Sequence, residues 1–278
     1  GEGRVYGSSK ILIVYRVCAI WIQVMNNAKF VAASCIHVPY HSEEAKDWLL
    51  AKLEEIKPTH FVLLGDLFDA AAVSVHSDEY YHSLEEEYEA GSNYLADIRK
   101  ALPTKTELVW CLGNHDDNIQ TKDPRRTQSA QRSLLHWNKH REFGDEFLKW
   151  KQIPYVKGPR GVYRLGPVRF FHGFDAGANS DEMETLQMVQ AIKDQAYSLW
   201  VRGHTHRPSP YVTQCRRSQK ILLPWYYANA GTLGPLKPDY MHRKDSNLWA
   251  HALVHGEYSL SFPRRPSIAD WSASVEHF

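Results

Sequence analysis

Five apolar, strand-like segments of this chain each run directly into a short polar turn that carries His, Asp or Asn. In chain order the turns are Cys35-Ile36-His37, Gly65-Asp66-Leu67-Phe68-Asp69, Gly113-Asn114-His115-Asp116, His172-Gly173 and Gly203-His204-Thr205-His206. In open α/β sheets, ligands bind beyond the carboxyl ends of the strands. The pattern therefore predicts an α/β protein in which these five turns meet at one site.

Helix-like segments separate the strands. Ser42 is expected to cap a helix that starts with Glu43 and Glu44 and stops at Pro58, because short polar side chains cap helices and acids suit the first turn. Apolar spacing predicts further helices over 84–101 and 127–150, and a fourth one capped by Ser180. The remainder is strand-rich, with strands expected over 221–227, 248–254 and 258–262.

The two ends of the chain are expected to lie outside a single domain of residues 25–262. Residues 1–24 are either an apolar strand or an extension derived from a vector or reading frame, and residues 263–278 are expected to be a loose tail. The apolar run 11–25 is too short to span a bilayer, is interrupted by Arg16 and Gln23, and lacks a signal-peptide cleavage site. We therefore expect no membrane association and a cytoplasmic location.

Composition narrows the class of protein further. Lys and Arg number 33 against 32 Asp and Glu, so a role with nucleic acid would depend on a local patch rather than on the net charge of +1. The four Cys lie far apart without a Cys-x-x-Cys pair, which excludes a disulfide scaffold.

The residue types in the five turns are those of a metal site. Imidazoles, a carboxylate, an amide oxygen and a thiol suit Zn²⁺, Mn²⁺ or Fe better than Ca²⁺ or Mg²⁺. His204 and His206 are two residues apart, so in an extended segment they point the same way and can bind metal together. Each turn alone also has a plain structural interpretation, but five in succession at strand ends indicate a metal centre.

In order and spacing the turns resemble the calcineurin-like metallophosphoesterase family, whose motifs are DxH, GDxxD, GNH[DE], a His often followed by Gly, and GHxH. The resemblance implies a four-layered α/β/β/α sandwich of two mixed sheets flanked by helices, in place of one doubly wound sheet. It also implies a hydrolase with two divalent metal ions. Asn229-Ala230-Gly231-Thr232 resembles the late structural turn of that family.

The resemblance assigns roles residue by residue. One metal would be held by Cys35, His37, Asp66 and His206, and the second by Asp66, Asn114, His172 and His204, with Asp66 bridging the two. His115 would protonate the leaving oxygen or steady the phosphate, and Asp116 would orient the His115 ring. Asp69 is expected to pack or cap the next helix rather than to touch metal, and His41 to face solvent, with a role near the substrate as the alternative.

Cys35 departs from the family pattern, which has Asp at this position. A thiolate binds Zn²⁺ or Fe well and suits Mn²⁺ poorly. Three interpretations of Cys35 follow. It is a metal ligand that selects a softer metal, or it does not bind the metal, which is then weakly held, or the site has lost its activity.

The leading expectation is a phosphoester hydrolase that prefers diesters, such as nucleotides or nucleic-acid ends. Cations that could contact phosphates gather in two segments, at Arg125, Arg126, Arg132, Lys139 and Arg141 and at Lys237, Arg243 and Lys244. The alternatives are a small-molecule phosphomonoesterase and a catalytically silent scaffold with the same fold. The HxHxDH run of a metallo-β-lactamase-like hydrolase is absent.

Overall fold

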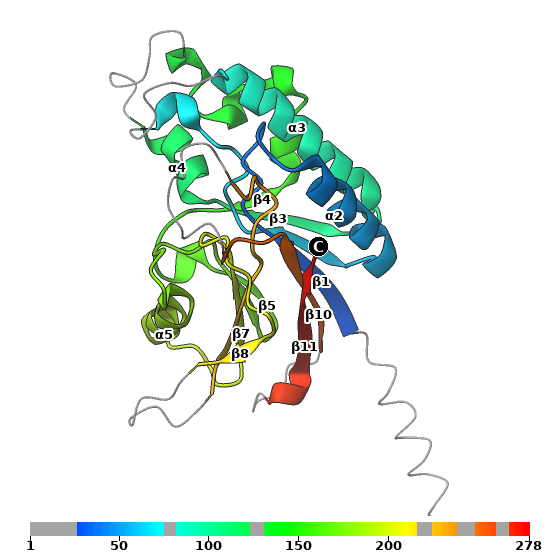
Figure 1. Ribbon diagram of the computed structural model, residues 1–278, viewed down its shortest axis with the longest axis vertical. Coiled ribbons are helices and arrows are strands. Elements are labelled where there is room, and N and C mark those ends of the chain that lie inside the picture. Colours follow the sequence, from blue (N-terminus) through cyan, green and yellow to red (C-terminus); the bar gives the residue numbers. More distant parts are fainter. Residues whose placement is uncertain (1–26, 75–81, 123–130, 216–223, 238–247, 260–266) are drawn as a thin grey trace, which may run out of the picture.

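Two β-sheets stacked face to face, with helices on their outer sides, make up the protein (Figure 1). This computed structural model describes residues 27–74, 82–122, 131–215, 224–237, 248–259 and 267–278. The predicted extension 1–24 and the cations Arg125, Arg126, Arg243 and Lys244 lie outside the described residues.

The first sheet has six strands in the order β11-β10-β1-β2-β3-β4. β1 (Asn27–Ala33), β2 (His60–Leu63), β3 (Glu107–Cys111) and β4 (Lys151–Ile153) run parallel. β10 (Ala252–Ser259) pairs antiparallel with β1, and β11 (Trp271–His277) pairs antiparallel with β10. The carboxyl ends of the four parallel strands therefore meet at one edge.

The second sheet has five strands in the order β5-β6-β7-β9-β8. β6 (Val168–Phe170), β7 (Leu199–Arg202) and β9 (Tyr226–Asn229) are parallel, whereas β5 (Tyr163–Leu165) and β8 (Thr213–Gln214) pair antiparallel at the two edges. Both sheets are mixed, as the predicted sandwich requires.

Helices complete the four layers (Figure 1). α2 (Glu43–Ile56) and α3 (Leu84–Ala101) cover the first sheet, and α5 (Ser180–Ile192) covers the second. The Ser42 hydroxyl accepts a hydrogen bond from the Ala45 N–H at 3.2 Å, which confirms the predicted cap. α5 begins at Ser180, but Asn179 rather than Ser180 holds its cap position. α4 (Asn114–Thr121) starts within the third polar turn.

The side chains of successive strand residues face opposite sides of a sheet, so each strand contributes to two separate layers of the core. Phe30 and Ala32 of β1 lie between the two sheets with Phe170 of β6. Val31 and Ala33 face the other way, into the cluster beneath α2 and α3.

The helix predicted over 127–150 is wrong for the described residues. Residues 132–149 form four short 3-10 turns, at Arg132–Leu134, Trp137–Lys139, Arg141–Phe143 and Glu146–Lys149. Positive φ angles at His136, Gly144 and Asp145 interrupt any continuous helix. The apolar spacing still marked buried side chains, since Trp137, Phe147 and Trp150 are all buried.

The loose tail predicted over 263–278 is wrong for residues 271–277, which form β11. Its signal is a period of two: Trp271, Ala273 and Val275 all pack against the cluster between the sheets. Of the strands expected over 248–254 and 258–262, residues 252–254 and 258–259 belong to one continuous strand, β10, whereas residues 248–251 precede that strand. Among the described residues, every helix is too short or too polar to cross a bilayer.

Candidate metal centre

All seven predicted metal ligands lie beyond strand ends at a single edge of the sandwich. Cys35 and His37 follow β1, Asp66 follows β2 and Asn114 follows β3. His172 follows β6 of the second sheet, and the pair in the Gly203–His206 turn follows β7. Both sheets therefore contribute to the centre.

The backbone around these residues is unusual. Five of the predicted ligands have positive φ angles although none is Gly: Cys35 (54°), His37 (56°), Asp66 (52°), His204 (70°) and His206 (58°). Positive φ is uncommon for such residues and clusters at functional sites, where the surrounding fold holds it in place. The turns are also packed tightly, because a Cβ on Gly113 would collide with the backbone and carboxylate of Asp66.

The first ligand group contains Cys35, His37 and His206. The Nε2 atoms of His37 and His206 are 3.3 Å apart, and His37 Nε2 lies 3.9 Å from Asp66 Oδ2. The Cys35 Sγ lies within 4.8 Å of a nitrogen of each of these imidazoles. This set corresponds to the first metal position that the sequence predicts.

The second group surrounds His172. Its Nε2 lies 3.1 Å from Asn114 Oδ1, 3.1 Å from His204 Nδ1 and 3.2 Å from Asp66 Oδ2. The other ring nitrogen of His172 faces the Leu64 carbonyl oxygen, which accepts a hydrogen bond from Nδ1 when that nitrogen carries the proton. That arrangement leaves Nε2 free to bind a metal.

Asp66 is shared by the two groups. Its Oδ1 accepts a hydrogen bond from the His115 backbone N–H at 3.0 Å, so Oδ2 is the oxygen that faces both His172 and His37. Burial raises the pKa of Asp66, but the neighbouring His172 and His115 outweigh this effect and hold the pKa well below its usual range. A carboxylate anion in this place suits bound cations.

The donor set fits divalent metal ions. Burial lowers the pKa of His204 to about 3 and that of His206 well below its usual range, with His172 and His37 adding to the respective shifts. Metal binding requires neutral imidazoles, and both are neutral near pH 7. Imidazole nitrogens, a carboxylate and an amide oxygen thus converge where a cation can join them.

Cys35 is the least typical member of the centre. Its side chain is fully buried, and its Sγ lies 3.0 Å from the Ser34 hydroxyl. Burial raises the pKa of the thiol, and the charge of Asp66 raises it further. A nearby cation opposes both effects, because coordination deprotonates a thiol.

His115 lies beside the centre, with its ring at 4.8 Å from the ring of His37, measured between centroids. Its Nδ1 contacts the Asp69 backbone oxygen, which leaves Nε2 as the nitrogen available for proton transfer. Burial lowers the pKa of His115, but Asp66 and the hydrogen bond to Asp69 outweigh this, so the pKa is raised.

The predicted role of Asp116 is wrong, because its carboxylate holds backbone and indole N–H groups and makes no bond to the His115 ring. It accepts hydrogen bonds from the N–H of Asp66 (2.9 Å), Gly113 (2.9 Å) and Phe68 (3.2 Å), and from Trp110 Nε1 (3.2 Å). Burial and the charge of Asp66 raise its pKa to about 7. Asp116 therefore joins the second and third polar turns, and the Asp69 carbonyl orients His115.

Asp69 and His41 also differ from expectation. Asp69 Oδ1 lies 3.2 Å from His37 Nδ1, so Asp69 supports a predicted ligand instead of capping a helix. The His41 side chain is only 10% exposed and lies 3.1 Å from Glu43, so it does not face solvent. No sequence signal marked Trp249, whose ring lies 4.3 Å from that of His206.

The late turn at Asn229 supports the Gly203–His206 turn, in keeping with the structural role that its resemblance implies. Asn229 Nδ2 donates to the Gly203 carbonyl oxygen at 3.1 Å and to Thr205 Oγ1 at 2.8 Å. Its Oδ1 accepts from the Gly231 N–H at 2.8 Å.

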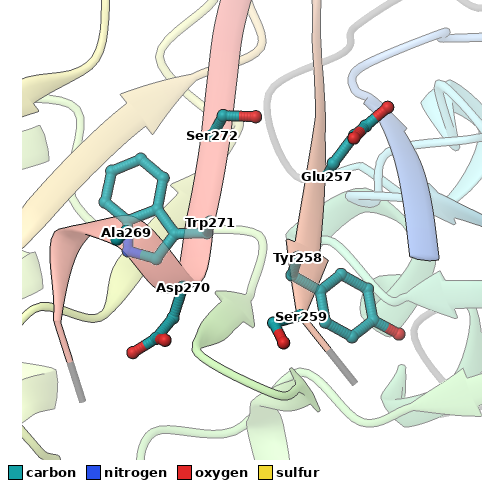
Figure 2. A pocket seen from close by; sticks show the side chains of 7 residues that line it. All are labelled: Glu257, Tyr258, Ser259, Ala269, Asp270, Trp271 and Ser272. Atoms are coloured by element: carbon teal, nitrogen blue, oxygen red, sulfur yellow. The ribbon is translucent and has the colours of Figure 1, made fainter. Parts of the chain in front are cut away.

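A small pocket lies at the other end of the first sheet (Figure 2). It is lined by Glu257, Tyr258, Ser259, Ala269, Asp270, Trp271 and Ser272. Ser259 pairs with Asn27, at the start of β1, whereas Cys35 and His37 follow the end of β1. The pocket is therefore separate from the metal centre.

Comparison with known proteins gives the family. The family described as calcineurin-like phosphoesterase matches residues 28–208, which is more than half of the chain. No curated protein sequence matches. A solved metallophosphoesterase from Sphaerobacter thermophilus is 12% identical, with 91% of this chain and 88% of that chain covered and a TM-score of 0.46.

Two further solved structures show similar coverage. YfcE, a phosphoesterase from E. coli, is 17% identical over 84% of this chain and 93% of that chain, with a TM-score of 0.37. A zinc complex of Vps29 from Entamoeba histolytica is 14% identical over 90% and 98%, also with a TM-score of 0.37. The family match and the motif residues gathered at one sheet edge agree: this chain belongs to the calcineurin-like phosphoesterase family and is a metallophosphoesterase.

Proposed function

We propose that this protein hydrolyses phosphoesters, with diesters preferred over monoesters, by means of two divalent metal ions that share Asp66. The observation that supports this most is the position of Asp66 Oδ2, at 3.2 Å from His172 Nε2 and 3.9 Å from His37 Nε2. Cys35, His37 and His206 complete one metal position, and Asn114, His172 and His204 the other.

Two bound ions would supply Lewis acidity toward the phosphoryl oxygens and make an attacking water more acidic. Asn114 is a neutral ligand, so it adds no negative charge that would weaken this acidity. The Asp66 Oδ1 bond to the His115 backbone N–H fixes the carboxylate plane. The fold thus holds the donor atoms in place before substrate binds, which avoids a cost of reorganisation.

His115 is the proton donor in this proposal. Its Nδ1 contacts the Asp69 carbonyl, so a protonated ring directs Nε2–H away from that anchor. General acid catalysis matters most when the leaving oxygen is basic, as in an alkyl or nucleoside ester. The preference for diesters, with nucleotides or nucleic-acid ends as the substrate class, rests on the cations that follow α4 in the sequence, Arg132, Lys139 and Arg141 among the described residues.

The test combines metal analysis with turnover of a generic diester, bis-nitrophenyl phosphate, and of the matching monoester. We expect two metal equivalents per chain and a higher kcat/KM for the diester. Asp66→Ala should abolish turnover and tight metal retention, while Asp47→Ala, at an exposed position on α2, should change neither. An Asp66→Ala protein that keeps two equivalents would show that Asp66 does not bridge.

The second candidate is a catalytically silent scaffold, which the buried Cys35 favours. This thiol occupies the place of an Asp, its side chain is fully buried, and burial raises its pKa. A scaffold would show fewer than two metal equivalents in the wild-type protein and no turnover of either ester.

A further inference from the structure

A buried cluster of charges lies behind the metal centre, between α5 and the end of β7. The Arg202 side chain is fully buried, and its Nη1 lies 2.8 Å from Glu184 Oε2 and 3.3 Å from Asp181 Oδ1. Glu184 is 2% exposed, while Asp181 is 21% exposed. None of these residues belongs to a family motif that the sequence displays.

We propose that Arg202, Glu184 and Asp181 are positioning residues that hold the turns of His172 and His204, and so set the affinity of the second metal position. This inference rests on the proposed two-metal function and names the part of the chain that controls one of the two ions.

The first contacts fix the turn that follows His172. Both carboxylate oxygens of Glu184 accept from the Phe174 N–H, at 3.1 and 3.0 Å. Arg202 Nη2 donates to the Asp175 carbonyl oxygen at 3.1 Å. The backbone of Gly173, with φ of 112°, lies so close to the guanidinium that a Cβ there would collide with it. The residues after His172 are thus held directly by the cluster.

The second contacts fix the turn that carries His204. Asp181 Oδ1 accepts from Asn229 Nδ2 at 3.2 Å and lies 3.4 Å from Thr205 Oγ1. Arg202 itself precedes Gly203 and His204 in the chain, and its carbonyl oxygen accepts from the Ala230 N–H at 2.9 Å. His204 has a φ of 70°, a conformation that persists only where neighbouring contacts enforce it.

The first metal position has other supports. The Cys35 N–H donates to the Gly65 carbonyl at 2.9 Å, and the His37 N–H to the Asp66 carbonyl at 3.1 Å. The His206 carbonyl accepts from the Ala250 N–H at 3.2 Å. Loss of the cluster should therefore loosen the second position more than the first.

The chain offers a matched control at the opposite end of α5. Arg169 and Asp194 form a second buried ion pair, with side chains 5% and 4% exposed and Nη2 at 2.9 Å from Oδ1. This pair also joins the second sheet to the end of α5, where Asp194 follows the C-cap residue Lys193, whereas Asp181 and Glu184 lie in the first turns of the helix. Asp194→Asn thus destabilises the same elements without touching the metal-centre turns.

The experiment loads the full chain with Zn²⁺, confirms the wild-type stoichiometry, and measures zinc transfer to a chromogenic chelator together with thermal stability. Removal of residues that orient metal ligands typically weakens metal affinity about 10–100-fold. We expect Glu184→Gln to weaken one zinc equivalent about 10–100-fold and the other much less. If Glu184→Gln does not fold, Asp181→Asn is the second variant, because Asp181 is more exposed. We expect Asp181→Asn to weaken the same zinc equivalent.

Asp194→Asn should lower the melting temperature and retain both equivalents with wild-type affinity. Equal weakening of both equivalents in Glu184→Gln, or the same zinc loss in Asp194→Asn, would overturn the inference. A wild-type protein with fewer than two zinc equivalents would overturn the proposed function together with it. If the wild-type protein binds two zinc equivalents and hydrolyses the diester, the proposed function stands. Variants that then fail to behave as expected would overturn this inference alone.

Discussion

Replacement of Asp116 by Ala should destabilise the protein before it impairs proton transfer. Asp116 is fully buried and accepts hydrogen bonds from four N–H groups, those of Asp66, Phe68, Gly113 and the Trp110 indole. Ala would leave all four donors without an acceptor, in turns that carry the proposed metal ligands.

The magnitude follows from the number of donors. A buried donor left unpaired costs about 1–3 kcal/mol. Water that enters the space left by the side chain can pair with these donors, so the cost per donor lies at the low end of this range, about 1 kcal/mol. Four donors then correspond to a loss of about 4 kcal/mol in the free energy of unfolding. For a chain of this size the melting temperature falls by about 2–4 °C per kcal/mol, which gives a decrease of about 8–16 °C.

Thermal unfolding of the metal-free protein is the assay, with two companion variants. Asp117→Ala changes the adjacent acid on α4, whose carboxylate accepts a hydrogen bond from the Thr121 hydroxyl of the same helix, and should stay within about 2 °C of wild type. Asp116→Asn keeps an acceptor oxygen without a charge to bury and should recover much of the loss. An Asp116→Ala protein that melts like Asp117→Ala, yet loses turnover, would refute this reasoning and restore the role of Asp116 toward His115.

His115→Ala should keep the full metal content and slow turnover by about 10²–10⁴-fold for alkyl or nucleoside esters, but little for nitrophenyl esters, whose leaving group needs no proton. Cys35→Asp should keep activity and shift the activating metal from Zn²⁺ or Fe toward Mn²⁺, whereas Cys35→Ser should weaken one metal selectively. In the metal-free protein, burial holds the pKa of His204 at about 3, so only the unfolded chain takes up this proton as the pH falls below about 6.5. Stability should therefore fall on acidification, by at most about 1.4 kcal/mol per pH unit from this group, and less steeply in His204→Gln.

For each of these three predictions, a specific result would contradict the expected outcome. Equal losses for both ester types would assign His115 to phosphate binding. An unchanged metal preference in Cys35→Asp, with a sulfur–metal distance well beyond about 2.3 Å in the wild type, would make Cys35 a packing residue. Identical pH dependence of the melting temperature in wild type and His204→Gln would show that His204 is not buried in the neutral form.

The helices α2 and α3 and the composition of the metal centre could be predicted from local sequence. Each polar turn directly follows an apolar strand, and the carboxyl ends of parallel strands meet at one edge, so residues far apart in the chain can be placed together without coordinates. Amphipathic spacing and a capping Ser were enough for α2, because both act within a few residues.

The features that could not be predicted depend on partners distant in sequence. Residues 132–149 have the apolar spacing of a helix, but packing against α3 and left-handed residues such as His136 divide them into short turns. β11 is a strand because β10 lies beside it. In the same way, Asp116 is next to His115 in the chain, yet its carboxylate meets N–H groups from the turn after β2 and from the Trp110 indole.

The sequence by itself determined which residue types assemble at the sheet edge, and in which order, since the motif positions are local to strand ends. Only the tertiary structure decided what each side chain contacts: Asp116 with four N–H donors, and Arg202 between Asp181 and Glu184 behind the second proposed metal position. The physical reason is that a hydrogen bond or buried ion pair depends on distance and direction in space, and spacing along the chain constrains neither once the partners belong to different elements.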